Sequence, residues 1–130
     1  MLMNESPNAI VQTSNLIKNF DLSGGEVVHV LKGVNMQVGK GEFIAIMGPS
    51  GSGKSTLLNI LSTLETITDG EVCIAGVSLH ELNRNETLRI RRHKSSIVFQ
   101  NFALIPYLTA KENVKLPMLL RKESEKKAED

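Results

Sequence analysis

Residues 48–56 read Gly48-Pro49-Ser50-Gly51-Ser52-Gly53-Lys54-Ser55-Thr56, and this stretch decides which fold the chain can adopt. It matches the pattern G-x-x-x-x-G-K-[ST], in which each fixed position has a mechanical role. Glycines let the backbone curl until successive N–H groups face one concavity that attracts anions. The lysine brings a positive charge toward the outer phosphates, and the hydroxyl after it is placed to ligate Mg²⁺. The stretch therefore predicts a phosphate-binding loop, in which Lys54 contacts phosphate and Ser55 contacts the metal.

The segments on either side of this loop fit a strand before it and a helix after it. Gly41 to Met47 is a short apolar run bounded by glycines, as a buried strand of a parallel sheet would be. We expect a helix to begin at Thr56, with its dipole adding to the attraction for phosphate. A Gly/Ser-rich surface turn is the alternative, and it does not account for both flanking patterns. One apolar helix face is predicted from residues at helical spacing: Leu57, Leu58, Leu61 and Leu64.

Composition indicates an ordinary globular domain. Hydrophobic residues make up 41% of the chain, and the formal net charge of +1 gives no argument for a nucleic-acid partner. The one cysteine, Cys73, cannot form an internal disulfide, and its alternation with Val72 and Ile74 favours a small strand residue. No apolar run is long enough to span a bilayer, and the first residues lack the features of a secretory signal. We therefore expect a cytoplasmic chain that meets a membrane only through a partner.

Other patterns predict the elements around the loop. The first third of the chain reads as antiparallel strands, and Glu71 to Ala75 alternates in the same way. A short helix is predicted through Arg84 to Arg92. Ile97 to Phe99 is expected to be a short buried strand that ends at Gln100. Thr109 to Glu112 has the pattern of a capped helix start.

Three stretches together resemble the N-terminal part of an ABC transporter nucleotide-binding domain. They are residues 48–56, then Ile97-Val98-Phe99-Gln100-Asn101-Phe102, and then Leu104 to Val114. The segment from Leu104 to Pro117 is similar to the subgroup that serves lipoprotein release, macrolide export and antimicrobial-peptide export. The resemblance covers about residues 10–120, but only a little over half of the family's domain. It implies an α/β fold: a P-loop NTPase core with an N-terminal antiparallel β-subdomain, truncated before the helical subdomain and the later parallel strands.

The resemblance also implies how the chain is divided. Residues 1–9 are expected to be a flexible N-terminus, residues 10–120 a partial nucleotide-binding domain, and residues 121–130 a charged helical tail where the helical subdomain would begin. In that tail, Glu123 and Lys127 form an i,i+4 pair. In the family, later sequence supplies the strands beside the loop strand. We therefore expect Phe43 to Met47 to have unpaired edges.

The ligand implied by the resemblance is ATP with Mg²⁺. Phe20 matches the aromatic residue that stacks on adenine, and Val30 matches a small apolar neighbour of the base. A role of Phe20 as a core residue of the hairpin is the alternative. Gln100 matches the glutamine that touches Mg²⁺ and the attacking water, so Lys54 and Gln100 are the expected catalytic residues, and Ser55 and Gln100 the metal ligands. The remaining expected contacts to the nucleotide are Gly48, Pro49, Ser50, Gly51, Ser52, Gly53 and Thr56.

Partners follow from the same resemblance. A transmembrane permease subunit would hold the chain at the inner face of the cell membrane, and a second nucleotide-binding subunit would dimerise with it in the presence of ATP. After Gln100 no apolar strand ends in an Asp-Glu pair, and no histidine follows His93. We therefore expect the isolated chain to bind ATP and barely hydrolyse it. Two functions stay open: an ATPase subunit of an ABC exporter, and a non-catalytic nucleotide-binding or interaction fragment. A small P-loop kinase is a weaker third, because no second substrate site is visible.

Two features favour ordinary interpretations. Leu22-Ser23-Gly24-Gly25-Glu26 nearly spells the family's LSGGQ signature, but it precedes the phosphate loop, so a hairpin turn explains it. A local basic cluster is expected to be a solvated helix face rather than a nucleic-acid contact. Its members are Arg84, Arg89, Arg91, Arg92, His93 and Lys94.

Overall fold

The computed structural model describes residues 9–80 and 82–120. They belong to two compact units, Met1–Ser95 and Ser96–Asp130. The predicted tail at 121–130, with its Glu123 and Lys127 pair, lies outside the described residues, and so does the predicted flexible N-terminus except for Ala9. Ala9 is already the first residue of a strand.

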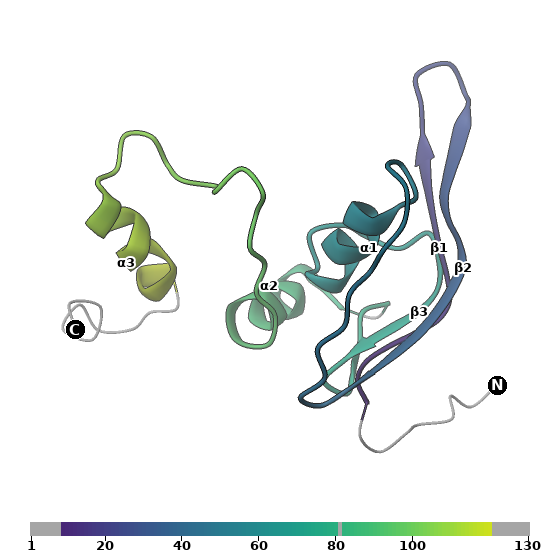
Figure 1. Cartoon of the computed structure of the whole chain (residues 1–130), viewed down its shortest axis with the longest axis horizontal. Coiled ribbons are helices and arrows are strands. Elements are labelled where there is room, and N and C mark those ends of the chain that lie inside the picture. Colours follow the sequence, from purple (N-terminus) through teal and green to yellow (C-terminus); the bar gives the residue numbers. More distant parts are fainter. Residues whose placement is uncertain (1–8, 81, 121–130) are drawn as a thin grey trace. The chain divides into compact units, whose positions relative to one another are not determined.

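The elements of the first unit are β1 (Ala9–Asp21), β2 (Val27–Gly39), α1 (Lys54–Leu61), β3 (Asp69–Ile74), β4 (Val77–Ser78) and α2 (Arg84–His93). Its strands form a four-stranded antiparallel sheet with the order β2-β1-β3-β4. Figure 1 shows the long hairpin of the first two strands, with α1 on one face of the sheet. The second unit contains the helix α3 (Ala110–Leu120).

A tight turn closes the hairpin of β1 and β2. The N–H of Leu22 donates to the carbonyl of Glu26 at 2.8 Å, and the N–H of Gly25 donates to the carbonyl of Leu22 at 3.2 Å. Gly24 and Gly25 have φ angles of 112° and 85°, a region that glycine enters without steric cost. The prediction of a hairpin turn at Leu22 to Glu26 is confirmed.

The core lies between α1 and the sheet. Leu16 from β1 and Ile60 from α1 are fully buried. Complete burial of one such aliphatic side chain stabilises a fold by about 1.5–3 kcal/mol. The rest of this cluster comes from β2, β3 and α1, and its buried members are Leu16, Leu31, Leu57, Ile60, Val72 and Ile74.

The predicted helix face is partly wrong. Leu57 is buried as expected, but Leu58 and Leu64 are exposed, and Ile60 takes the inward position instead. The helix α1 begins at Lys54, before the predicted Thr56, and ends at Leu61. Leu64 therefore lies beyond the helix, where the spacing of a helical face no longer applies.

The two predicted parallel strands are not strands here. Phe43 is 97% exposed and Met47 86% exposed, and Val98 in the other segment is also 97% exposed. Neither segment has a hydrogen-bonded neighbour in the sheet within residues 9–80 and 82–120. An apolar run becomes a buried strand only when neighbouring strands pair with its backbone groups. The expectation that Phe43 to Met47 would have unpaired edges is confirmed for the described residues.

Both later helices begin where the sequence predicted. Asn83 caps α2 in a reciprocal capping box with Glu86. At the start of α3, the Thr109 N–H donates to Glu112 Oε2 at 2.7 Å, and the Glu112 N–H donates to Thr109 Oγ1 at 3.3 Å. Each pair satisfies backbone groups that a helix start leaves without partners.

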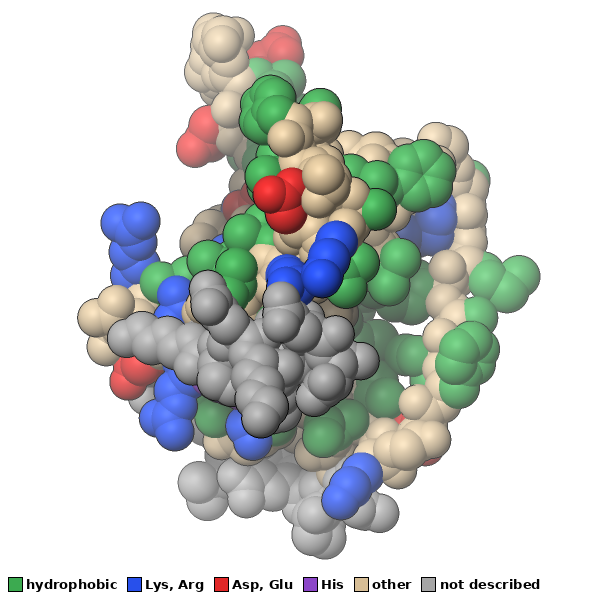
Figure 2. Space-filling model, turned by 90° about the vertical axis from the view of Figure 1, so that its left-hand side faces the viewer, with side chains coloured by type: hydrophobic (Ala, Val, Ile, Leu, Met, Phe, Trp, Pro, Cys, Tyr) green, Lys and Arg blue, Asp and Glu red, His purple; other side chains and the backbone are tan. Residues whose placement is uncertain are grey.

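Many large apolar side chains are exposed, in both units. Figure 2 shows hydrophobic side chains, in green, at the surface of one face. Within the described ranges, no helix is both long and apolar enough to cross a membrane. The most exposed apolar side chains are Phe43, Met47, Val98, Phe102 and Tyr107.

Candidate phosphate-binding site

The phosphate loop, residues 48–56, overlaps the start of α1 at Lys54 to Thr56. Gly51 and Gly53 have φ angles of 78° and 89°, in the left-handed region that favours glycine. Gly53 is also the N-cap of α1, and no side chain caps this helix. The first N–H groups of a helix have no intrahelical acceptor, and the helix dipole adds positive potential there. This geometry makes the start of α1 suitable for an anion.

Lys54 places its charge on this loop. Its Nζ donates to the carbonyl of Pro49 at 2.7 Å and to the carbonyl of Gly48 at 3.0 Å. A longer contact of 3.4 Å reaches Ser52 Oγ. The ammonium group is therefore already held at the loop by neutral acceptors. A phosphate oxygen that took their place would be a stronger acceptor, because it is charged.

Ser55 is exposed at the second position of α1. Within the described residues its hydroxyl makes no hydrogen bond, so the oxygen is free to ligate a cation. The same part of the chain contains no cluster of three or more His, Cys, Asp or Glu residues that could hold a metal by themselves. A cation at Ser55 would therefore depend on phosphate oxygens for most of its ligands, as Mg²⁺ commonly does.

Val30 lies directly against the loop. A Cβ added at Gly53 would be 3.2 Å from the Val30 carbonyl oxygen and 3.3 Å from Val30 Cγ1. It would also be 2.9 Å from Leu31 Cδ2. In the ladder between β1 and β2, Lys18 pairs with Leu31 while Asn19 pairs with His29, so the register shifts at Val30. Such a bulge redirects a side chain locally, and here it lies where β2 meets the loop.

Phe20 lies on β1 opposite Val28 and is half-buried. It is not a member of the buried core cluster found among the described residues. Lys18 Nζ lies over its ring at 4.7 Å from the centroid. These two side chains share a face of the sheet because residues two apart on a strand point the same way. The structure thus weakens the alternative in which Phe20 serves the hairpin core.

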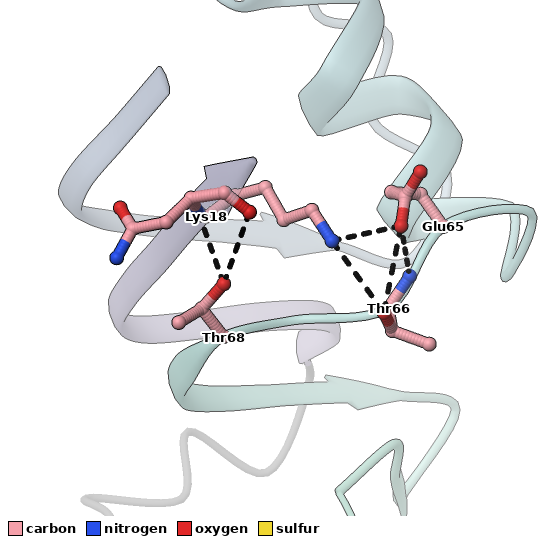
Figure 3. A network of polar contacts seen from close by, with 5 residues as sticks. Lys18, Glu65, Thr66 and Thr68 are labelled. Carbon is pink, nitrogen blue, oxygen red and sulfur yellow. Dashed lines mark hydrogen bonds and ion pairs between the residues drawn. The ribbon is translucent and has the colours of Figure 1, made fainter. Parts of the chain in front are cut away.

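Lys18 is itself held by an ion pair, which Figure 3 shows from close by. It is 6% exposed, and its Nζ lies 2.8 Å from Glu65 Oε1. This hydrogen bond lowers the pKa of Glu65, against a smaller opposing effect of burial. The carboxylate form of Glu65 is thereby favoured, and the buried lysine has the acidic partner that a buried basic side chain requires.

Gln100 belongs to the second unit, where it is exposed at the first residue of a turn. The structure brings the phosphate loop and Val30 together within the first unit, with Phe20 on the same sheet. The catalytic and metal-binding roles of Gln100 stay predictions.

Sequence reasoning missed Lys18 and Glu65. A signal was available, because Leu16, Lys18 and Phe20 alternate along β1 and their common face points inward at Leu16. A lysine at an inward position is rarely buried unless it is paired. The partner could not be found in the same way, since Glu65 is 47 residues away in the sequence.

Comparison with known proteins gives consistent matches. The family model described as ABC transporter matches residues 31–130. An uncharacterized ABC transporter ATP-binding protein, MJ0796 of Methanocaldococcus jannaschii, is 46% identical over 112 residues, which are 86% of this chain and 47% of that protein. The lipoprotein-releasing system ATP-binding protein LolD of Alcanivorax borkumensis is 45% identical over 119 residues, 92% of this chain and 51% of LolD.

A solved structure resembles this fold closely. It is the dimeric structure of a post-hydrolysis state of the ATP-binding cassette MJ0796 bound to ADP and Pi, with a TM-score of 0.83 and 43% identity. The match covers 92% of this chain and 53% of that one. The chain thus spans about half the length of MJ0796 and of LolD.

Proposed function

The chain belongs to the ABC transporter family, and from this premise we propose that it binds Mg-ATP as the nucleotide-binding part of an ABC exporter. In this proposal residues 10–120 are the N-terminal portion of the nucleotide-binding domain. Export rests on the resemblance to a lipoprotein-releasing ATP-binding protein.

The observation that carries the proposal is the fit between the loop and β2. Gly53 has no room for a side chain, because Val30 and Leu31 lie against it, and its φ of 89° favours glycine. A loop held in this way presents the first N–H groups of α1 in a fixed position. Fixed N–H groups and the charge of Lys54 provide the preorganised electrostatics that phosphate binding needs.

Each residue has a stated role in the proposal. The backbone of residues 48–53 and the N–H groups at the start of α1 cradle the phosphates, and Lys54 neutralises the charge of the outer ones. Ser55 supplies a hydroxyl ligand to Mg²⁺, and Gln100 supplies a second contact. Bound Mg²⁺ would neutralise charge that develops on the phosphates. Phe20 stacks on the base, with Val30 beside it.

Hydrolysis belongs to the family, and we propose that this chain alone carries it out slowly. A carboxylate that polarises the attacking water is needed for a fast reaction. The one described acid after Gln100 is Glu112, which accepts hydrogen bonds from the N–H and the hydroxyl of Thr109 and caps α3. Glu112 therefore has a structural role.

Partners complete the proposal. A permease subunit would hold the chain at the inner face of the membrane, and a second nucleotide-binding subunit would pair with it. The support is that MJ0796 forms a dimer and that LolD is part of a lipoprotein-releasing system. Exposed apolar side chains such as Tyr107 and Phe43 are also typical of surfaces that other proteins cover.

A second candidate is a non-catalytic nucleotide-binding or interaction fragment. It is favoured by the segment from Phe43 to Met47, whose backbone has no sheet neighbour in the described residues. Unpaired extended backbone readily accepts a strand from another chain. ATP binding without lysine-dependent turnover would support this candidate.

The experiment is a titration of the chain with a fluorescent ATP analogue, followed by an assay of released phosphate. Lys54→Ala is expected to abolish most binding, whereas Lys32→Ala, which removes an exposed lysine from β2, should leave it unchanged. Absence of binding by the unaltered chain, or equal losses in both variants, would contradict the proposed function. Appreciable turnover that depends on Lys54 would contradict slow hydrolysis.

A further inference from the structure

We propose that the ion pair of the buried Lys18 with Glu65 positions Phe20 so that a single ring face is open to the base. The pair thereby governs recognition of the nucleoside rather than of the phosphates. The inference rests on the proposed function, since it concerns the same nucleotide site. It makes Lys18 a positioning residue and assigns it no contact with the ligand.

The first step is the occupied face of the ring. Lys18 Nζ lies over Phe20 at 4.7 Å from the ring centroid, and Lys18 is 6% exposed. A cation within about 6 Å of an aromatic face is attracted by the ring quadrupole. One face of Phe20 is therefore covered by a buried ammonium group, and a base can stack only on the opposite face.

The second step is what fixes the ammonium group. Nζ donates to Glu65 Oε1 at 2.8 Å, with a weaker contact to Thr66 Oγ1 at 3.5 Å. Glu65 Oε1 also accepts the Thr66 N–H at 2.9 Å, so the carboxylate does not rotate freely. A lysine stem has many rotamers, and these bonds select one of them.

The third step is the strand next to the ring. The N–H of Asn19, the residue before Phe20, donates to Thr68 Oγ1 at 2.9 Å, and the Thr68 N–H donates to the Ile17 carbonyl at 3.0 Å. Figure 3 shows Thr68 near the backbone end of Lys18, whereas Glu65 and Thr66 lie near the nitrogen at the end of its side chain. Residues 65–68 thus hold the backbone of β1 as well as the lysine head.

The fourth step links the base end of the site to the phosphate end. The helix α1 starts at Lys54 in the phosphate loop and ends at Leu61, shortly before Glu65. The same chain segment therefore presents the phosphate-binding N–H groups at its start and holds Lys18 at its end. Loss of the pair would release Phe20 while the start of α1, packed through Leu57 and Ile60, keeps its place.

A purely stabilising ion pair is the competing interpretation, and the two differ in what they predict for ligands without a base. If the pair only stabilises the fold, its loss weakens the binding of ATP and of tripolyphosphate to the same degree. If the pair positions Phe20, its loss weakens the binding of ATP alone. The ratio of the two affinities separates these cases even when a variant is less stable.

The experiment is calorimetric titration of the 130-residue chain with Mg-ATP and with Mg-tripolyphosphate. Lys18→Met keeps an unbranched apolar stem and removes the charge, and Lys32→Met is the matched control at an exposed position of β2. We expect Lys18→Met to weaken the binding of ATP by about fivefold to tenfold, which is within the range of one cation–π contact. The affinity for tripolyphosphate should change less than about twofold. Lys18→Arg should restore ATP binding, because guanidinium also pairs with carboxylate and stacks on aromatic rings.

Equal losses for the two ligands, or unchanged ATP binding, would overturn the inference. If the unaltered chain binds tripolyphosphate as tightly as ATP, there is no base contact and the inference fails, while the phosphate loop stands. If it binds neither ligand, the proposed function itself fails. Should Lys18→Met not fold, as judged by circular dichroism, Glu65→Gln tests the same point, with a smaller loss again confined to ATP; equal losses in Glu65→Gln also overturn the inference.

Discussion

Substitution of Gly53 by alanine tests most directly how the phosphate loop is held. The new Cβ would lie 2.9 Å from Leu31 Cδ2 and 3.2 Å from the Val30 carbonyl oxygen, and φ at this position is 89°. The carbonyl belongs to the backbone of β2 and cannot rotate away, and Leu31 is buried. Either the loop or the strand must therefore move.

The expected cost has two parts. An alanine in the left-handed region costs about 1–2 kcal/mol. Crowding a packed contact by one methyl group adds about 1–3 kcal/mol. Gly53→Ala should therefore lower the free energy of unfolding by about 2–5 kcal/mol, the sum of these parts. The substitution should also weaken the binding of ATP, because displacement of the loop moves the N–H groups at the start of α1.

Gly51→Ala is the matched control. Gly51 has a φ of 78°, but a Cβ there would meet nothing within 4 Å. Gly51→Ala should therefore lower the free energy of unfolding only by the backbone strain, about 1–2 kcal/mol. Urea denaturation of both variants, with and without ATP, measures the difference. Equal destabilisation by the two substitutions would refute the reasoning, because crowding against Val30 and Leu31 would then contribute nothing.

Three further outcomes are expected. Lys54→Ala should weaken binding of a fluorescent ATP analogue more than Phe20→Ala, because a charge pair is worth up to about 4 kcal/mol and base stacking about 1–3 kcal/mol; the reverse order would contradict this. The hydrogen bond from Lys18 lowers the pKa of Glu65 from 4.5, so the pair's stabilisation is present above pH 4.5 and lost as the pH falls through the folded value. Urea midpoints measured between about pH 6 and pH 3 should fall more steeply for the unaltered chain than for Glu65→Gln, and parallel curves would argue against the pair. Asn83→Ala removes the capping box of α2 and should cost about 1 kcal/mol in the same denaturation assay; an unchanged urea midpoint would contradict this role of Asn83.

Local features were predicted well from the sequence. The turn at Leu22 to Glu26 and the helix starts at Arg84 and Ala110 depend on residues within a few positions of one another, so their patterns carry the needed information. Gly41 to Met47 and Ile97 to Phe99 were wrong as buried strands. Hydrophobic runs show what a segment could bury, but pairing depends on a neighbour that the run does not encode.

The amino-acid sequence by itself determined the chemistry of the phosphate loop, because glycines, a lysine and a hydroxyl at fixed spacing in residues 48–56 act through the backbone of that same segment. Only the tertiary structure decided how the loop and the ring are held. Val30 of β2 lies close to Gly53 of the loop, and the hold on Phe20 depends on Lys18 reaching Glu65 across 47 residues. Steric fit and ion pairing act through space, so such contacts become visible only when distant parts of the chain are brought together by folding.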